Sequence, residues 1–394
     1  MKAVGIVAEY NPFHNGHYYH LSQSKKVSGA DVAICVISGD FVQRGEPAMI
    51  DKFTRTQMAL KGGADLIIML PFAYSCQSAE IFAYGAVYLL NKLACGVISF
   101  GCENDDIKTL YKAAKIVSEE NEDFKTILKK HLSSGRSFAK SRQLTVEQMV
   151  PESVDLLGSP NNILAIEYIK QIISNNYPIT PLAIRRCGSN HNTKETDETY
   201  ASASYIREMI KNKDSATKKY VPSFVYDFIK CRPLNELENY KGILYQNLLI
   251  KSIEQLCSYP DVSEDLANRL FNNFKDFLPL AKYIDCVYNK HHTKSRISRS
   301  LCHILTDFNI PYDTIKKYPV PYVRILGFNE KGKQYLHSIK DNENFISNVY
   351  DYYKHCNGYA KQIFDYDLTA SDVFQLNFHS GKGIDYRTAP IYYK

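Results

Sequence analysis

Tryptophan is absent from this sequence of 394 residues, and its ten cysteines include no C-x-x-C pair. The missing pairs exclude the common zinc-ribbon and thioredoxin-type motifs. Cys35, Cys95 and Cys302 lie inside apolar segments, where a thiol serves as a small buried hydrophobe, and we expect a reduced, cytoplasmic location. No segment approaches the roughly 18 uninterrupted apolar residues of a membrane helix, and the start lacks a signal peptide. The sequence therefore predicts neither secretion nor membrane insertion.

Neither sign of charge is in large excess, because 48 Lys and Arg stand against 42 Asp and Glu and the net charge is +6. The basic charge is concentrated, however, since residues 282–340 hold 11 Lys and Arg against 4 Asp and Glu. A local basic face indicates a nucleic-acid partner, although it is also typical of a solvated surface. With 45% hydrophobic residues, the chain is long enough for two domains with their own cores.

Residues 3–21, AVGIVAEYNPFHNGHYYHL, predict a strand, a turn and a helix in that order. A helix N-terminus just past a parallel strand presents free N–H groups and partial positive charge to a phosphate. His14 and His17 lie on one face of the first helical turn, where both can bind the same anion, and Gly16 leaves room for a base or ribose. The histidines are alternatively turn caps or half of a metal site.

Strands and helices alternate beyond this start. Buried strands are predicted over residues 32–37, 66–70 and 96–100, with helices over 52–61 and 79–93. This alternation predicts an α/β fold with a doubly wound parallel sheet, whose ligands lie outside the carboxyl ends of the strands. His14, His17, Asp40 and Gly101 follow such strands and become candidates as a set.

The rest of the chain predicts an insertion and a domain boundary. Residues 105–148 are charged and helical in pattern, which indicates an inserted helical pair. Pro222 and Ser223 mark a boundary, so we expect one domain over 1–220 and a mainly helical domain over 221–394. One extended piece, residues 322–328, has no clear strand partner.

A second phosphate-binding pattern is the segment ASASYIREMI at residues 201–210. Ser202 and Ser204 form a hydroxyl-rich helix start, and Arg207 follows in the second turn. Hydroxyl groups with one guanidinium bind a polyphosphate and stabilise departing pyrophosphate. The alternative is an ordinary N-cap with a surface arginine.

The loop over residues 38–48 carries Asp40, Gln43, Arg44 and Glu46 at the carboxyl end of a predicted strand. Asp40 is positioned to orient or deprotonate an attacking amine, and Arg44 to hold a carboxylate or phosphate. An Arg44–Glu46 surface pair is the structural alternative.

The segment KSRISRSLCHIL at residues 294–305 predicts an amphipathic basic helix. Ile297, Leu301 and Ile304 form its buried stripe, and Lys294, Arg296 and Arg299 form a basic side suited to an RNA backbone. A solvated lysine-rich face is the alternative.

The H-x-G-H spacing after a first strand resembles the HIGH-type nucleotidyltransferase superfamily. The stretches GIVAEYNPFHNGH and SGDFVQRGEPA resemble more narrowly the bacterial tRNA(Met) cytidine acetate ligases, through most of the chain. The resemblance implies an ATP-binding catalytic domain over 1–220 and a tRNA-binding domain beyond it, with His14, His17, Asp40 and Arg44 as catalytic residues. It implies tRNA contacts at Lys294, Arg296 and Arg299, and ATP contacts at Val7, Ala8, Glu9, Tyr10, Asn11, Pro12, Phe13, His14, Asn15, Gly16, His17, His20, Gly101, Asn162, Arg186, Ser202, Ser204 and Arg207.

Two positions depart from the family pattern. Ala165 stands where the family usually has glycine after Asn-Asn-Ile-Leu, and residues 187–192 are one residue shorter than usual. Arg186 is preferred to Arg185 as the ATP contact, because strand alternation lets only one of them face the site.

The implied reaction is ATP-dependent ligation in two steps. Acetate attacks the α-phosphorus of ATP, and the acetyl group then passes to the exocyclic amine of the wobble cytidine of elongator tRNA(Met). Mg²⁺ is expected with the ATP, without a protein ligand that the sequence identifies, and DNA and membranes are not expected as partners. The rivals are an adenylyltransferase that makes a nucleotide cofactor and a non-catalytic RNA-binding protein on the same fold.

Overall fold

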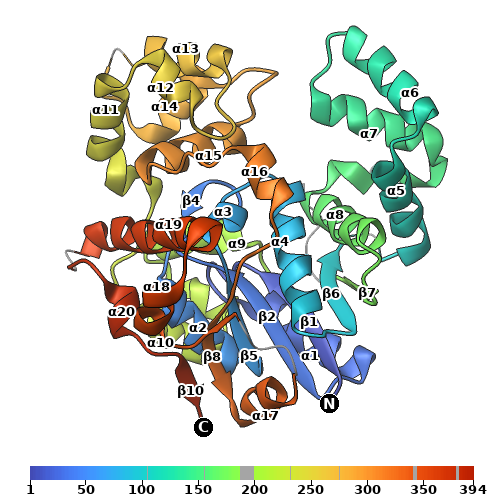
Figure 1. Cartoon of the computed structure of the whole chain (residues 1–394), viewed down its shortest axis with the longest axis vertical. Helices are drawn as coiled ribbons and strands as arrows, with labels where there is room; N and C mark the ends of the chain where they lie inside the picture. The colour runs from blue at the N-terminus through green and yellow to red at the C-terminus, as the bar shows by residue number, and fades with distance from the viewer. Residues whose placement is uncertain are drawn as a thin grey trace.

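A computed structural model describes residues 1–103, 105–154, 156–186, 199–230, 232–274, 276–339, 344–378 and 381–394. Within these ranges, one eight-stranded sheet has the order β10-β8-β5-β2-β1-β6-β7, with β9 paired to β8 (Figure 1). Its strands are β1 (Ala3–Ala8), β2 (Val32–Ser38), β5 (Leu66–Leu70), β6 (Val97–Cys102), β7 (Thr180–Arg185), β8 (Val323–Asn329), β9 (Phe345–Ile346) and β10 (Ile391–Tyr393). A separate antiparallel hairpin consists of β3 (Phe41–Val42) and β4 (Glu46–Pro47).

The strands β5, β2, β1, β6 and β7 are mutually parallel, as the sequence predicts. Chain order runs outward from β1 in both directions, so the order reverses between β1 and β6. Such a switch point leaves space beyond the carboxyl ends of the two strands, where ligands bind in doubly wound folds. His14 follows β1 and Glu103 follows β6, so both lie at this position.

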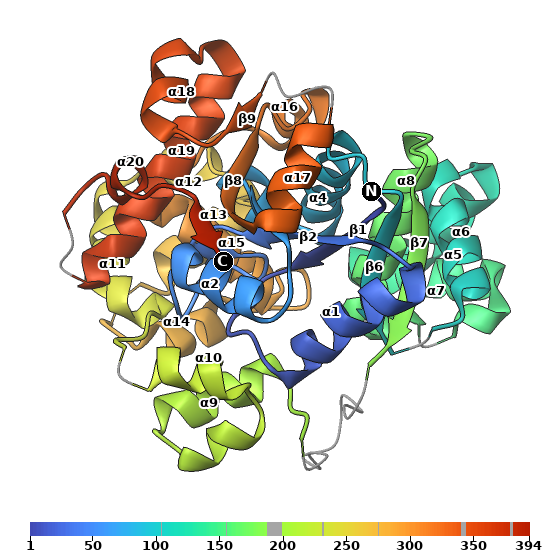
Figure 2. The same cartoon turned by 90° about the horizontal axis from the view of Figure 1, so that it is seen from below.

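Both faces of the sheet are covered, because consecutive residues of the central strands enter two different cores. Ile34 and Val36 pack into one hydrophobic cluster, and Cys35 and Ile37 pack into the other. In Figure 2 helices lie on both sides of the strands. The helices of this half are α1 (Asn15–Ser28), α2 (Lys52–Lys61), α3 (Phe72–Ser75), α4 (Ala79–Lys92), α8 (Pro160–Ser174), α9 (Ala203–Lys211) and α10 (Ser223–Ile229).

The insertion between β6 and α8 contains three helices, where the sequence predicts a pair. They are α5 (Ile107–Glu119), α6 (Glu122–Ser133) and α7 (Phe138–Met149), followed by the short 3-10 helices η1 (Pro151–Ser153) and η2 (Leu156–Gly158). Separate N-caps explain the division, because Asp106, Asn121 and Ser137 each accept a hydrogen bond from the first turn of one helix. Helix α5 packs along α8 and so joins the insertion to the core.

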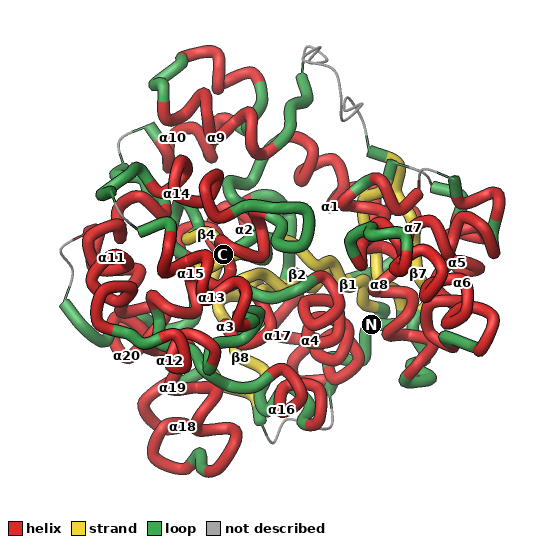
Figure 3. The backbone as a smooth tube through the Cα atoms, turned by 90° about the horizontal axis from the view of Figure 1, so that it is seen from above, coloured by secondary structure: helices red, strands yellow, loops and turns green. Residues whose placement is uncertain are grey.

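The region beyond residue 220 is mainly helical, but it does not form a separate body. Strand β8 pairs antiparallel with β5, and β10 pairs with β8, so the extended piece without an expected partner lies in the central sheet. The expected boundary at residue 220 therefore divides one sheet. Figure 3 shows β1, β2 and β8 among the helices that surround the strands. The other elements here are η3 (Ser215–Lys219), η4 (Leu237–Tyr240), α11 (Lys241–Ile250), α12 (Ile253–Cys257), α13 (Glu264–Asn272), α14 (Leu280–Val287), α15 (Lys294–Leu305), α16 (Tyr312–Lys317), α17 (Glu330–Ser338), α18 (Val349–His355), α19 (Gly358–Gln375), η5 (Leu376–Phe378) and α20 (Ile384–Arg387). Among the described residues, no helix has the length and apolar character needed to cross a membrane.

Candidate active site

His14 is the N-cap of α1, and its ring stacks on that of His17 with 3.7 Å between centroids. The His17 amide donates to His14 Nδ1 at 3.4 Å, and the His14 amide donates to His17 Nδ1 at 3.3 Å. Because each Nδ1 accepts from the backbone, the proton of each neutral ring lies on Nε2. The pair therefore presents the His14 ring N–H at the helix start, while the His17 ring also hydrogen-bonds the Pro12 backbone.

Burial keeps these imidazoles uncharged. Burial, together with the charges of Arg186 and Arg207, lowers the pKa of His14 to about 3. Burial likewise brings the pKa of His17 well below its ordinary value and that of His20 to about 4. At neutral pH the site thus holds neutral donors beside two permanent cations.

Gly16 makes the stacked pair possible. A Cβ on Gly16 would lie 2.9 Å from His14 Cε1, closer than carbon atoms approach in proteins. The room that Gly16 leaves is therefore filled by the His14 ring, whereas the sequence assigned it to a base or ribose.

The start of α1 offers fewer free amides than a helix N-terminus usually does. The Asn15 amide donates to Tyr220 O at 2.9 Å, and that of His17 donates to His14. Among the first three amides of α1, only that of Gly16 has no partner within the described residues. Anion binding here consequently depends on the His14 ring N–H more than on the backbone.

Several residues of the expected ATP segment have their side chains in the core. Tyr10 and Phe13 are fully buried in the hydrophobic cluster below α1, and Asn11 Oδ1 accepts from the Met49 amide at 2.7 Å. These side chains shape the turn that presents His14. His20 Nε2 lies 3.1 Å from Ser99 Oγ on β6, which ties α1 to the neighbouring strand.

The ends of β6 and β7 form a second wall of the site. The Glu103 amide donates to Asn162 Oδ1 at 3.1 Å, and Glu103 Oε1 accepts from Asn161 at 2.6 Å and lies 3.9 Å from Arg186 Nε. Arg186 Nε is buried without a hydrogen-bond partner among the described residues, while Arg185 is exposed on the other side. The Arg186 stem lies beside Gly101, where a Cβ would make an ordinary contact of 3.4 Å with Arg186 Cγ. Arg186 therefore stays the predicted ATP contact of the two.

The start of α9 forms the third wall. Ser202 caps the helix and lies 3.1 Å from Ser204 through the hydroxyl oxygens. Arg207 Nη1 donates to Asn11 O at 3.1 Å, and Asn15 Nδ2 donates to Lys219 O at 2.9 Å. The segments that hold His14 and Arg207 are therefore joined by direct hydrogen bonds, although nearly 200 residues separate them.

Arg55 was not predicted as a site residue, but its hydrogen bonds to backbone carbonyls hold the turns at the ends of β1 and β2 in place. Its buried guanidinium donates to Glu9 O at 2.8 Å, to Ser38 O at 3.0 Å and to Gly39 O, and its Nε donates to Ile50 O at 2.9 Å. A lone arginine in a short amphipathic helix carries no signal of this role in the sequence.

Asp40 does not lie free at the site. It is 4% exposed, its Oδ1 accepts from the Lys52 amide at 3.0 Å, and its Oδ2 contacts Lys52 Nζ at 2.6 Å and Ser371 Oγ at 3.0 Å. Lys52 Nζ also pairs with Asp385 Oδ1 at 2.9 Å, and Arg324 Nη2 does so at 2.6 Å. This buried network corrects the expectation that Asp40 handles the incoming amine, because both of its oxygens are occupied. Arg44 is exposed and forms no ion pair within the described chain.

The basic helix also differs from its expected form. Arg299 is 8% exposed and pairs with Asp261 Oδ2 at 2.9 Å, while Arg296 Nε donates to Asp261 O at 2.8 Å. Lys294 is exposed and lies 2.6 Å from Asp285. The helix does border the site, because Gly45 of the β3–β4 turn lies against the Arg299 backbone so closely that a Cβ would be 2.2 Å from its amide nitrogen. Arg299 is thus corrected from an RNA contact to a structural residue.

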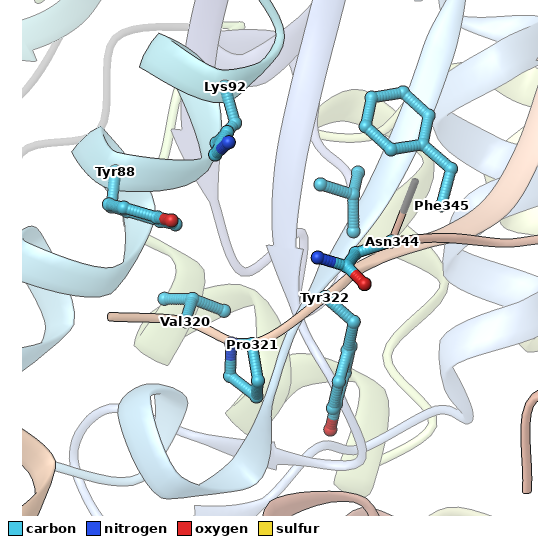
Figure 4. A pocket seen from close by; sticks show the side chains of 8 residues that line it. Tyr88, Lys92, Val320, Pro321, Tyr322, Asn344 and Phe345 are labelled. Carbon is cyan, nitrogen blue, oxygen red and sulfur yellow. The ribbon is translucent and has the colours of Figure 1, made fainter. Parts of the chain in front are cut away.

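A small cavity beside α4 is not a rival site. Tyr88 and Lys92 of α4 lie opposite Tyr322 and Asn344 there, and its volume is about 30 Å³ (Figure 4). A pocket for a small ligand usually measures roughly 300 Å³ or more. Within the described residues, no group of three His, Cys, Asp or Glu side chains is arranged to hold a metal ion.

Comparison with known proteins agrees with this geometry. Residues 1–386 match the family model described as HIGH Nucleotidyl Transferase. A tRNA(Met) cytidine acetate ligase of Caldicellulosiruptor saccharolyticus is 39% identical over 406 aligned residues, covering 100% of this chain and 99% of that protein. The enzyme of the same name from Clostridium acetobutylicum is 40% identical, with 95% of this chain and 96% of the relative covered.

Solved structures give the same result. Thermotoga maritima TmcAL bound with alpha-thio ATP superposes with a TM-score of 0.89 at 29% identity, covering 100% of this chain and 99% of that one. The apo form of the same protein gives a TM-score of 0.91 with the same coverage.

Proposed function

Since this chain belongs to the HIGH nucleotidyl transferase family, and within it to the tRNA(Met) cytidine acetate ligases, we propose that it acetylates the wobble cytidine of elongator tRNA(Met) with ATP and acetate. The observation that carries the proposal is the stacked, neutral His14–His17 pair at the start of α1, with Arg186 and Arg207 on the adjoining walls. Such donors and cations suit a triphosphate at the switch point of the sheet.

The first step makes acetyl-adenylate. An acetate oxygen attacks the α-phosphorus, the bond from that phosphorus to the bridging oxygen breaks, and pyrophosphate leaves. The Nε2–H group of His14, whose ring stacks on His17, donates to an oxygen whose charge rises in the transition state, and being neutral it holds its proton at pH 7. Arg207, with Ser202 and Ser204, binds the departing pyrophosphate, and Arg186 faces the phosphates from the opposite wall.

The second step transfers the acetyl group. The N4 amine of cytidine attacks the acetyl carbonyl, the bond to the adenylate oxygen breaks, and AMP and N4-acetylcytidine result. Acetate enters as the free anion, and the exposed Arg44 is the cation available to meet it at the rim. Mg²⁺ accompanies ATP in such reactions and neutralises phosphate charge, and the phosphate oxygens supply its ligands in this proposal.

The tRNA lies along the helical region after residue 220, over the edge where α15 borders the site. Lys294 and Arg296 remain the proposed phosphate contacts of α15, Arg296 through the guanidinium nitrogens not used by Asp261. A tRNA substrate places the enzyme in the cytoplasm.

The test measures two reactions. Acetate-dependent exchange of labelled pyrophosphate into ATP reports the first step, and mass spectrometry of nucleosides from elongator tRNA(Met) reports N4-acetylcytidine. Exchange that does not depend on acetate, without acetylated tRNA, would favour the cofactor-forming adenylyltransferase. Absence of exchange would favour the non-catalytic RNA-binding protein.

A further inference from the structure

Forming an amide at N4 releases a proton, and the carboxylates around the site differ in how fully their oxygens are used. Both oxygens of Asp40 are occupied, and those of Glu103 accept from Ser159 and Asn161. Glu46 is half-exposed at the rim, 3.9 Å from Arg207. None of these three is well placed to take a proton inside the site.

Glu9 has a different environment, because only one of its two carboxylate oxygens accepts a hydrogen bond within the described residues. It directly follows β1, and its Oε1 accepts from the Gln43 amide at 3.0 Å. Gln43 is itself fixed, since its Nε2 donates to Gln77 O at 3.1 Å, and Arg55 holds the Glu9 carbonyl. The other carboxylate oxygen of Glu9 makes no hydrogen bond within the described residues.

The groups around Glu9 come from four other parts of the chain, and Arg55 of α2 is one of them. Arg207 faces it from α9, Arg44 and Glu46 from the β3–β4 turn, and Tyr168 from α8. Burial raises the pKa of Glu9 more than the two arginines lower it. A partly buried carboxylate of this kind is a stronger base than an exposed one.

We propose that Glu9 is the general base of the transfer step, a catalytic residue that takes the N4 proton on its free oxygen as the amine attacks. The bond from N4 to the acetyl carbon forms, the bond from that carbon to the adenylate oxygen breaks, AMP keeps the electron pair, and the proton passes from N4 to Glu9. This inference rests on the proposed function and adds a role to the expected contact of Glu9 with ATP.

The experiment separates the two steps in full-length Glu9→Gln. Synthetic acetyl-adenylate with tRNA(Met) measures transfer in a single turnover, and acetate-dependent pyrophosphate exchange measures the first step. We expect transfer to slow by at least about 10²-fold, the usual scale for a lost general base, and exchange to fall by less than about tenfold. In the wild type, transfer rises with pH as Glu9 ionises and then levels, and Glu9→Gln loses this rise.

Glu208→Gln is the matched control, because Glu208 is an exposed carboxylate on α9 that lies next to Arg207 in the sequence. It should leave both rates and the pH profile unchanged. If Glu9→Gln does not fold by circular dichroism, Glu9→Asp carries the test, with slower transfer and a retained rise with pH.

Two results would overturn the proposal. Equal slowing of both steps would make Glu9 an organiser of the ATP site, and transfer at the wild-type rate, in either variant, would remove it from catalysis. If the wild type itself formed no N4-acetylcytidine, the proposed function would fail and this inference with it. If the wild type acetylates tRNA and the variant keeps pace, only the role of Glu9 is refuted.

Discussion

One histidine can cap a helix and bind a phosphate at once when its two ring nitrogens have separate tasks. His14 uses Nδ1 to accept from the first turn of α1 and leaves Nε2–H for a ligand. Removing the ring therefore removes a stabilising cap together with a catalytic donor, and the two effects need different substitutions to be told apart.

The variants His14→Ala and His14→Asn separate these effects. Asparagine is a preferred N-cap, so His14→Asn should keep the free energy of unfolding close to that of the wild type, while His14→Ala loses about 1 kcal/mol. Both should slow acetate-dependent pyrophosphate exchange by about 10²- to 10³-fold, because each lacks the ring donor. Denaturant unfolding and exchange assays measure the two quantities, and wild-type exchange in either variant would contradict the role of His14.

The buried histidines also predict how stability depends on pH. The folded-state pKa is about 3 for His14 and about 4 for His20, below the ordinary value of 6.5. Between these values and pH 6.5, the unfolded chain therefore binds protons that the folded chain does not bind. The contribution of each neutral imidazole to the free energy of unfolding is complete above pH 6.5. It is lost as the pH falls toward the folded-state pKa, at about 1 kcal/mol per pH unit for each imidazole. Urea unfolding between pH 7 and pH 5 should show this loss, and His20→Gln should reduce its slope. An unchanged slope in the variant would show that His20 titrates normally in the folded protein.

At the scale of elements, the sequence predicted what depends on local pattern and missed what depends on long-range partners. The N-caps, the apolar stripe of α15 and the parallel strands follow from neighbouring residues, and the structure confirms them. Residue type and position assigned Asp40 to the incoming amine and Arg299 to RNA. Both assignments were wrong because no local signal reveals that Lys52 and Asp261 neutralise these side chains. The partner of β8 was missed for the same reason, since β5 lies about 260 residues earlier.

Helix α15 provides a direct comparison between a structural and an RNA-facing basic residue. Arg299→Ala removes the ion-pair partner of the largely buried Asp261, so it should destabilise the fold by about 3 kcal/mol. Lys294→Ala should leave stability unchanged, weaken tRNA binding, and reduce the slope of log affinity against log salt by about 1. Thermal unfolding and filter binding at several salt concentrations measure both variants. An unchanged salt slope for Lys294→Ala would place the RNA surface elsewhere.

At the scale of the whole molecule, the sheet of residues 1–220 is completed by strands from residues 221–394. Strand β5 is buried along its length, and its free edge is covered by β8 from beyond the expected domain boundary. Asp385 and Arg324 complete the ion network that holds Lys52 and Asp40.

A fragment of residues 1–220 should therefore not fold as an independent domain. Its β5 edge would present Leu66, Ile67 and Ile68 to solvent, and an uncovered apolar edge strand promotes aggregation. We expect the fragment to lack a cooperative thermal transition and to show no ATP-dependent stabilisation, both measurable by calorimetry. A soluble fragment that unfolds cooperatively would restore the boundary at residue 220.

The pairing of β5 with β8 also has a consequence during synthesis on the ribosome. Translation proceeds at roughly 5–20 residues per second, so the interval between making Leu66 and its partner Phe328 is on the order of 13 to 50 seconds. Throughout that interval the nascent chain carries an apolar strand whose permanent neighbour does not yet exist. The first half of the chain therefore stays without its edge strand until synthesis has passed residue 328.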